Sequence, residues 1–290
     1  MVLLAVILVA LVLLSVGLGI AVHRLVPERW GGPLRWGRSL ALRMGSVSAF
    51  LVVSLVGVIV TFLVMLPVGV LVKSLQDSVD LPVFKWTLGL VNSGSAFTKF
   101  NSYATTLGDR STIDLVCVIA ALVLSFAYGR RWWIPVVAIG VTFFAQHEGQ
   151  LLLAQLLARD LPPVAHPGTF PSGGVSRVIV DYGVIIVLVI LLIGTLSRQW
   201  RAGLWIGLGA FATIEGFTRG YLLLHWITDI FAGYIFGWML FVTFATAVAA
   251  LETRTSLFSG ERHASNDRDR ISGDESPGDR VGSASGLDHG

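Results

Sequence analysis

Long apolar runs, more than any motif, limit what this chain can fold into. A helix needs about 20 predominantly apolar residues to cross the roughly 30 Å hydrocarbon layer of a bilayer. Of the 290 residues, 54% are hydrophobic and only 13% are charged. Seven candidate spans occur along the sequence, at residues 2–22, 46–72, 112–128, 134–158, 178–196, 204–217 and 226–251. We therefore predict an all-α fold, a polytopic membrane helix bundle.

Composition divides the sequence into three predicted parts. Residues 1–45 hold an extra N-terminal transmembrane helix and a basic cytoplasmic loop. We expect this helix to be retained rather than cleaved as a signal peptide, because no positive residue precedes it and no small-residue cleavage pattern follows it. Residues 46–251 hold the other six runs, and residues 252–290 are rich in Ser, Gly, Asp and Arg. This last segment is expected to be a disordered tail.

Arginines gather on one set of connections, which predicts the orientation in a cell membrane. They follow the first, third and fifth runs: Arg24, Arg29, Arg35, Arg38, Arg43, Arg130, Arg131, Arg198 and Arg201. Because short cytoplasmic loops carry an excess of Lys and Arg, we expect the N-terminus outside and the C-terminal tail in the cytoplasm. The segments 73–111, 159–177 and 219–225 then lie on the outer face.

Several classes of function are disfavoured by what the sequence does not contain. A single cysteine, Cys117, excludes an intramolecular disulfide framework and a cysteine metal cluster. No Gly-rich nucleotide loop follows a strand, and no basic surface is interleaved with aromatic residues. We therefore expect no metal, no cofactor and no nucleic acid partner, while the sequence makes no prediction about protein partners.

Polar groups interrupt the apolar runs at positions that a membrane should not contain. The fourth run carries QHEGQ at residues 146–150, and Asp181, Glu215 and Asp229 lie in later runs. Each intramembrane charge costs about 2.5 to 3.5 kcal/mol on insertion scales, so it needs a partner, an aqueous cavity or a function. One explanation is a buried hydrogen-bond network between helices; for the group as a whole, we favour a site that opens outward.

The sequence EGFTRGYLLLHWITD, between the last two runs, carries groups suited to phosphate chemistry. His225 and Asp229 are four residues apart, so if both are helical the carboxylate can accept the imidazole N–H. A histidine oriented in this way can attack phosphorus, and Arg219 offers a planar fork for phosphate oxygens. Glu215 can hold that fork. The alternative is a Glu215–Arg219 ion pair beside a helix-packing histidine.

The stretch TRGYLLLHWITD resembles the third motif of the type 2 phosphatidic acid phosphatase superfamily, integral membrane lipid phosphate phosphatases related to vanadium haloperoxidases. That motif is Ser-Arg, five residues, His, three residues, Asp. Thr218 takes the serine position, and Arg219, His225 and Asp229 take the other three. The resemblance covers residues 46–251 as a phosphatase-like membrane domain. It implies that His225 is the nucleophile, that Asp229 orients it and that Arg219 binds the phosphate.

The family's second motif, Pro-Ser-Gly-His, is only partly present. The chain has Ser172, Gly173 and then Gly174 in place of the histidine that acts as general acid in the family. Amides at the start of a helix bind anions, so we expect this stretch to bind phosphate without supplying a proton.

The first motif, Lys, six residues, Arg-Pro, is also degenerate. Gln155 stands at the lysine position and Pro162 at the arginine position, so both cations are absent. Arg159, His166 and Arg177 lie in the same loop as conceivable replacements, although none has the family's spacing.

The resemblance implies a metal-independent phosphatase that acts on a membrane lipid phosphate or polyprenyl diphosphate at the outer face. Loss of a general acid typically costs about 10² to 10⁴ in rate, so a diphosphate, which releases phosphate, is the favoured substrate. A degenerate member that binds phospholipid, polyprenyl phosphate or a partner without turnover is the main alternative. A third is a transporter or structural membrane protein that uses QHEGQ as a substrate or proton path.

Overall fold

The computed structural model describes residues 31–163 and 170–272, and the predicted first run, residues 2–22, lies outside them. The described residues form helices and turns, with no β-strand among them, which confirms the all-α fold class. The longer helices are α2 (Gly31–Met44), α3 (Ser46–Ser74), α4 (Leu81–Leu88), α5 (Ala96–Ala104), α6 (Arg110–Tyr128), α7 (Trp133–Leu157), α9 (Gly183–Ile193), α10 (Arg198–Tyr221) and α11 (Ile227–Ser272). The shorter ones are η1 (Gln76–Asp80), η2 (Thr105–Gly108), η3 (Gly129–Arg131), α8 (Gly173–Arg177) and η4 (Val178–Tyr182).

Five helices of the described part are long and apolar enough to cross a membrane: Ser46–Ser74, Arg110–Arg131, Trp133–Leu157, Gly173–Ile193 and Ile227–Thr253. In the fourth of these, α8, η4 and α9 follow one another without a break. The predicted sixth run, residues 204–217, lies in α10 and is not among the five. Charged residues near both ends of α10 lower its hydropathy, yet it packs against α8, α9 and α11.

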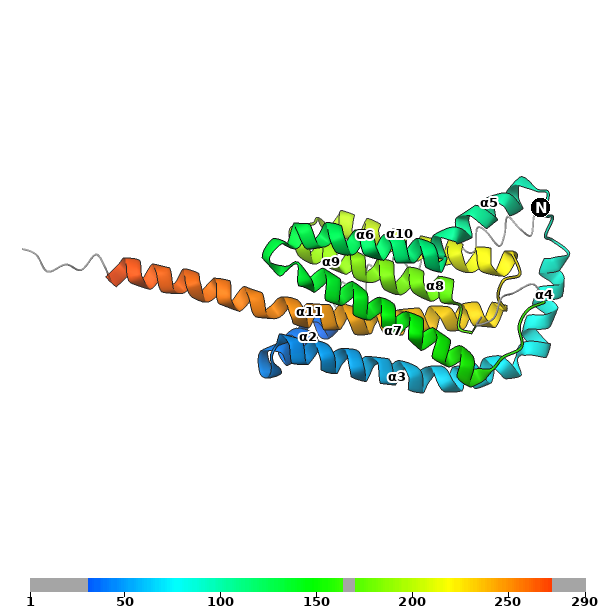
Figure 1. Ribbon diagram of the computed structural model, residues 1–290, viewed down its shortest axis with the longest axis horizontal. Helices are drawn as coiled ribbons and strands as arrows, with labels where there is room; N and C mark the ends of the chain where they lie inside the picture. The colour runs from blue at the N-terminus through cyan, green and yellow to red at the C-terminus, as the bar shows by residue number, and fades with distance from the viewer. Residues whose placement is uncertain (1–30, 164–169, 273–290) are drawn as a thin grey trace, which may run out of the picture.

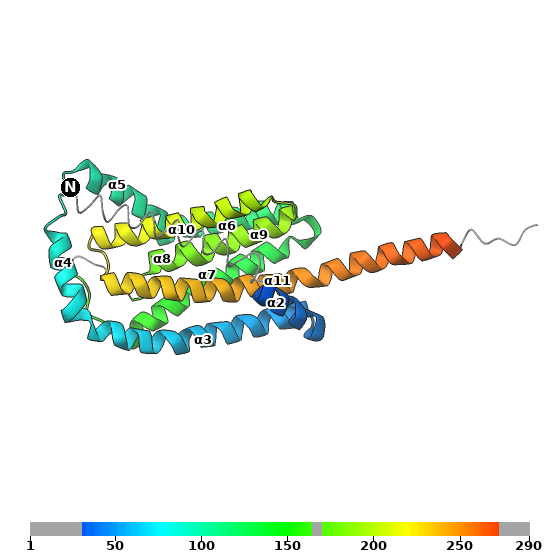
Figure 2. The same cartoon turned by 180° about the vertical axis from the view of Figure 1, so that it is seen from behind.

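Helix α11 is the centre of the bundle. It packs against α2, α3, α7, α8 and α9, and Figures 1 and 2 show it running between α3 and the group formed by α6, α9 and α10. Phe236, Leu240 and Phe244 on α11 are fully buried. Gly233 brings it close to Ser172, because a Cβ at position 233 would lie 2.8 Å from the Ser172 carbonyl oxygen.

The predicted tail differs from the structure in its first part. Helix α11 continues past the bundle to Ser272 and projects from it as a single helix (Figure 1). Adding residues to an existing helix avoids the costly nucleation step, which explains how a polar segment can continue a packed helix. Residues 273–290 lie outside the described part of the chain.

The three segments predicted to share one face meet at one end of the bundle, where α4 and α5 lie (Figure 1). Arg177 Nη1 donates to the Gly108 carbonyl at 2.8 Å, which joins segment 159–177 to segment 73–111. Arg219 Nη2 donates to the Thr105 carbonyl at 3.3 Å, which joins segment 219–225 to segment 73–111. The shared end is therefore confirmed, while its side of the membrane stays a prediction.

Candidate active site

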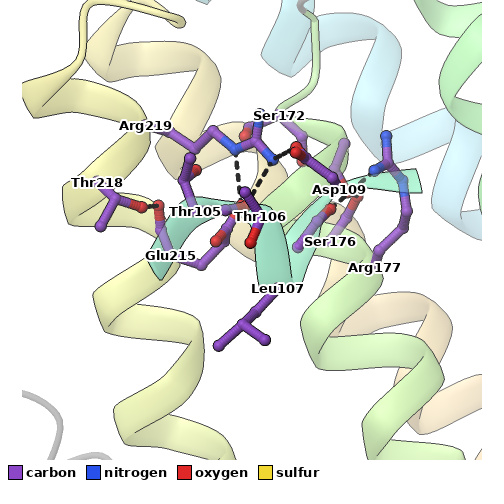
Figure 3. Close-up of polar contacts among 12 residues, drawn as sticks. Thr105, Thr106, Leu107, Asp109, Ser172, Ser176, Arg177, Glu215, Thr218 and Arg219 are labelled. Carbon is purple, nitrogen blue, oxygen red and sulfur yellow. Dashed lines mark hydrogen bonds and ion pairs between the residues drawn. The ribbon is translucent and has the colours of Figure 1, made fainter. Parts of the chain in front are cut away.

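Arg219, in the last turn of α10, is held by two carboxylates (Figure 3). Its Nε donates to Glu215 Oε1 at 2.6 Å, and its Nη2 donates to Asp109 Oδ1 at 2.5 Å and to the Thr105 carbonyl at 3.3 Å. The Glu215 side chain is fully buried, whereas that of Asp109 is 43% exposed. The predicted Glu215–Arg219 pair is confirmed, and Asp109 is a second partner that the sequence did not indicate.

The Ser172–Gly174 stretch is fixed between α10 and α11. The Ser172 amide donates to the Asp229 carbonyl at 3.0 Å. A Cβ at Gly174 would lie 2.4 Å from Glu215 Oε1 and 2.8 Å from Arg219 Nε. The structure thus brings Ser172, Gly173 and Gly174 together with Arg219 and Asp229. It also shows that the space a side chain would need at position 174 is filled by the Glu215–Arg219 pair.

Arg177, one turn into the same helix, adds a second guanidinium near this stretch. A Cβ at Gly173 would lie 2.6 Å from Arg177 Nη2 and 2.8 Å from Gln150 Oε1. Figure 3 shows Arg177 reaching toward the turn that carries Asp109. Its Nη1 bond to the Gly108 carbonyl holds it there. Of the three conceivable replacement cations, Arg177 therefore lies closest in the chain to the Ser172–Gly174 stretch and contacts its surroundings.

Arg159, which the sequence offered as a replacement for the missing phosphate-binding cations, binds two carboxylates of the protein instead. Its guanidinium donates to the carboxylates of Asp80 and Asp229, to Thr228 Oγ1 at 3.1 Å and to Gln76 Oε1 at 3.2 Å. The Arg159 side chain is only 2% exposed, and both carboxylates are fully buried. The charge of Arg159 is therefore used to join η1 and the start of α11.

His225 and Asp229 do not lie on one helix, so the helical condition attached to their predicted contact is not met, while the contact itself stays a prediction. Helix α10 ends at Tyr221, Leu223 adopts a left-handed φ of 60°, and α11 begins at Ile227. His225 therefore lies in the turn between the helices, whereas Asp229 lies in the first turn of α11. The Asp229 carboxylate accepts from Arg159 and its carbonyl accepts from Ser172.

His225 lines an apolar cavity of about 470 Å³ between α4, α10 and α11. Most of the wall is aromatic or aliphatic, including Phe84, Trp86, Phe217, Phe231 and Trp238. Asp80 and His225 contribute an acidic and a basic group to this wall. The cavity therefore offers a hydrocarbon-like space next to a histidine.

A comparison of the sequence with protein-family models and with curated proteins finds no match. The structure, however, is similar to the crystal structure of a transmembrane PAP2-type phosphatidylglycerolphosphate phosphatase from Bacillus subtilis. The TM-score is 0.55 at 22% identity, and the match covers 63% of this chain and 92% of that one. This chain has the PAP2 fold. The fold that the third-motif resemblance implied is therefore confirmed.

Within this PAP2 fold, the polar residues of α7 divide into a buried and an exposed set. Gln146 Nε2 donates to Ser176 Oγ at 2.9 Å, and Gln150 contacts the start of α8. Glu148 and Gln155 are exposed on the outside of α7. A buried hydrogen bond between helices, the alternative explanation for these polar groups, is thus present for Gln146, whereas Gln155 is exposed.

His166 lies outside the described residues. No group of three or more His, Cys, Asp or Glu side chains is arranged to hold a metal ion in the part of the chain that the structure describes.

Asp80 and Asp109 belong to the two arginine clusters, and the sequence did not indicate either of them. Asp80 lies in η1, which follows α3, and Asp109 precedes α6. Asp109 pairs with a residue 110 positions away, and Asp80 bonds one 148 positions away. Neither has a fixed spacing to a motif. The sequence indicates only that both residues lie in segment 73–111, one of the three segments predicted to lie on the outer face.

The buried Arg159 pairs should contribute strongly to stability. Arg159→Leu leaves Asp80 and Asp229 buried without their cation, so we expect the free energy of unfolding to fall by about 3 to 5 kcal/mol. Arg110→Leu is the matched control, since its pair with Asp114 is exposed at 3.8 Å and should contribute at most about 1 kcal/mol. Thermal unfolding in detergent, followed by tryptophan fluorescence, measures both. Equal losses in the two variants would contradict a structural role for Arg159.

Proposed function

We propose that this chain is an integral membrane lipid phosphate phosphatase that works through a His225 nucleophile. The observation that carries the proposal is the placement of Ser172–Gly174, which contacts Arg219 on one side and Asp229 on the other. Two sequence motifs more than 40 residues apart thereby contribute to one site. The similarity to a PAP2-type phosphatase supports this reading at the level of fold.

The start of α8 is the proposed phosphate site. Amides in the first turn of a helix lack intrahelical acceptors, and the helix dipole favours an anion there. Because α8 continues through η4 and α9, this start belongs to a helix of 21 residues. Ser172 Oγ is buried and has no hydrogen-bond partner among the described residues. Together with Arg219 and Arg177, it can contact phosphate oxygens.

The cavity beside His225 is the proposed site for the hydrocarbon part of a substrate. Its apolar lining between α4, α10 and α11 suits an acyl or prenyl chain. A chain bound there places the attached headgroup near the His225 side of the cavity. The substrate class is therefore a membrane lipid phosphate or a polyprenyl phosphate or diphosphate.

The proposed reaction has two steps. His225 attacks phosphorus, the bond to the leaving oxygen breaks with its electron pair, and a phosphohistidine forms; water then attacks phosphorus and releases free phosphate and the imidazole. Gly174 has no side chain that could protonate the leaving oxygen, and the Glu215–Arg219 pair fills the space that a side chain at position 174 would need. A phosphate leaving group tolerates this loss better than an alkoxide, so diphosphates should react fastest.

One observation favours a second candidate, a protein that binds such lipids without turnover. Arg219 is paired with both Glu215 and Asp109, and Asp229 is paired with Arg159. A site whose charges are already matched inside the protein can bind a headgroup weakly and still lack the activated groups for catalysis. Measured phosphate release separates the two candidates.

Phosphate release by the purified full chain should depend on His225. We expect release from polyprenyl diphosphate to exceed release from the monophosphate, and we expect His225→Ala to reduce it by at least about 10³, since the nucleophile is lost. His263→Ala, in the C-terminal segment, is the matched control and should retain full activity. Release that survives His225→Ala would contradict the nucleophile, and a monophosphate cleaved as fast as its diphosphate would contradict the leaving-group argument.

We also propose that the end of the bundle with α4 and α5 faces outward and that the C-terminal segment is cytoplasmic. Cys117 is the sole cysteine and is buried, so single-cysteine variants can be built on Cys117→Ala. A membrane-impermeant maleimide should label Ser93→Cys, between α4 and α5, on intact cells. It should label Ser285→Cys only after lysis. The reverse pattern would contradict the positive-inside assignment.

A further inference from the structure

The guanidinium of Arg219 has two edges that can bind phosphate in a bidentate manner, one formed by Nε and Nη2 and the other by Nη1 and Nη2. Glu215 occupies Nε, and Asp109 and the Thr105 carbonyl occupy Nη2. Within the described residues, Nη1 donates no hydrogen bond. Nη2 has two N–H groups and both are used, so a bidentate phosphate on either edge must displace an acceptor of Nη2, and on the Nε edge it must also displace Glu215.

Of the two carboxylates, Asp109 is the one that can move. Glu215 is fully buried, and its carboxylate fits against the backbone on two sides, since a Cβ at Gly108 or at Gly174 would lie 2.2 Å or 2.4 Å from Oε1. Asp109 is 43% exposed and lies between η2 and α6. Glu215 can therefore keep Nε in place while Asp109 leaves Nη2.

Asp109 has an alternative position ready for its carboxylate. It is the N-cap residue of α6, with an extended φ of −69° and ψ of 150°, yet its side chain makes no capping hydrogen bond. Asp is among the preferred N-cap residues because its carboxylate accepts from the first amides of the helix. The first turn of α6 contains no acidic residue that would oppose this. A carboxylate that leaves Arg219 can thus turn to the amides of α6.

We propose that Asp109 competes with the substrate phosphate for Arg219 and moves to the α6 N-cap when a phosphate binds. This rests on the proposed function, which assigns Arg219 to phosphate. Asp109 is then a specificity-determining residue: it neutralises Arg219 in the empty site and selects ligands that carry enough negative charge to displace a carboxylate. Phosphate dianions meet this requirement, whereas phosphodiesters, with a single charge, bind much less well.

Affinity for inorganic phosphate tests the competition directly. In the full chain in detergent, measured by isothermal titration calorimetry, Asp109→Asn should bind phosphate about tenfold more tightly than the unmodified protein, because one adjacent negative charge is removed. Asp109→Ser, which keeps an N-cap hydroxyl, should do the same. Asp114→Asn is the matched control, since the Asp114 side chain is 44% exposed on the same helix; its affinity should not change.

Variants of Arg219 separate this inference from the proposed function. Arg219→Ala should weaken phosphate binding, and adding Asp109→Asn to it should bring no gain. If Arg219→Ala weakens binding but Asp109→Asn and Asp109→Ser leave it unchanged, the competition is wrong and the phosphate site stands. A gain from Asp109→Asn in the Arg219→Ala background also overturns the competition. If no variant binds phosphate, or if Arg219→Ala binds it normally, the proposed site fails and this inference fails with it.

Discussion

The buried contact of Arg159 with Asp80 and Asp229 is the interaction on which the arrangement of the site depends. It joins three segments, because Arg159 follows α7, Asp80 ends η1 and Asp229 lies in the first turn of α11. The Asp229 carbonyl in turn holds the Ser172 amide at 3.0 Å. Ionisable groups buried in a membrane protein are paired with one another. Because Asp229 pairs with Arg159 through its carboxylate and accepts from Ser172 through its carbonyl, the same residue also positions the start of α8.

The two arginine clusters share a pattern but differ in burial, and this difference separates their roles. Each guanidinium binds two carboxylates, Asp80 and Asp229 around Arg159, and Glu215 and Asp109 around Arg219. Breaking a fully buried pair leaves an uncompensated charge, whereas an exposed partner can exchange with water or a ligand. The Arg159 cluster is therefore structural, and the Arg219 cluster keeps one exchangeable partner.

The sequence predicts most of the bundle, because span length and hydropathy are local properties. The Glu215–Arg219 pair also follows from helical spacing, and the resemblance to the phosphatase family assigned phosphate binding to both Arg219 and the Ser172–Gly174 stretch. Asp80 and Asp109 could not be found in this way, since they lie in short connecting segments and contact residues between 79 and 148 positions away in the chain. The turn before α11 was missed as well, because the local spacing of His225 and Asp229 is equally compatible with a helix.

The α7 residues Gln146 and Gln150 bear on the transport alternative. Both contact the α8 segment, and Gln146 bonds Ser176 at 2.9 Å. Helix-joining contacts of this kind explain these amides without a translocation path. Gln146 and Gln150 therefore contact α8 from one side while α11 contacts it from the other.

The most direct test of the central claim is an experimental structure of the full chain with bound vanadate, which mimics phosphate in its reactive geometry. The account predicts the anion at the Gly173 and Gly174 amides, with Arg219 Nη2 released from Asp109 and a nitrogen of His225 within bonding distance of vanadium. Vanadate bound elsewhere, or bound there with His225 turned away, would contradict a single site formed by the α8 start, Arg219 and His225.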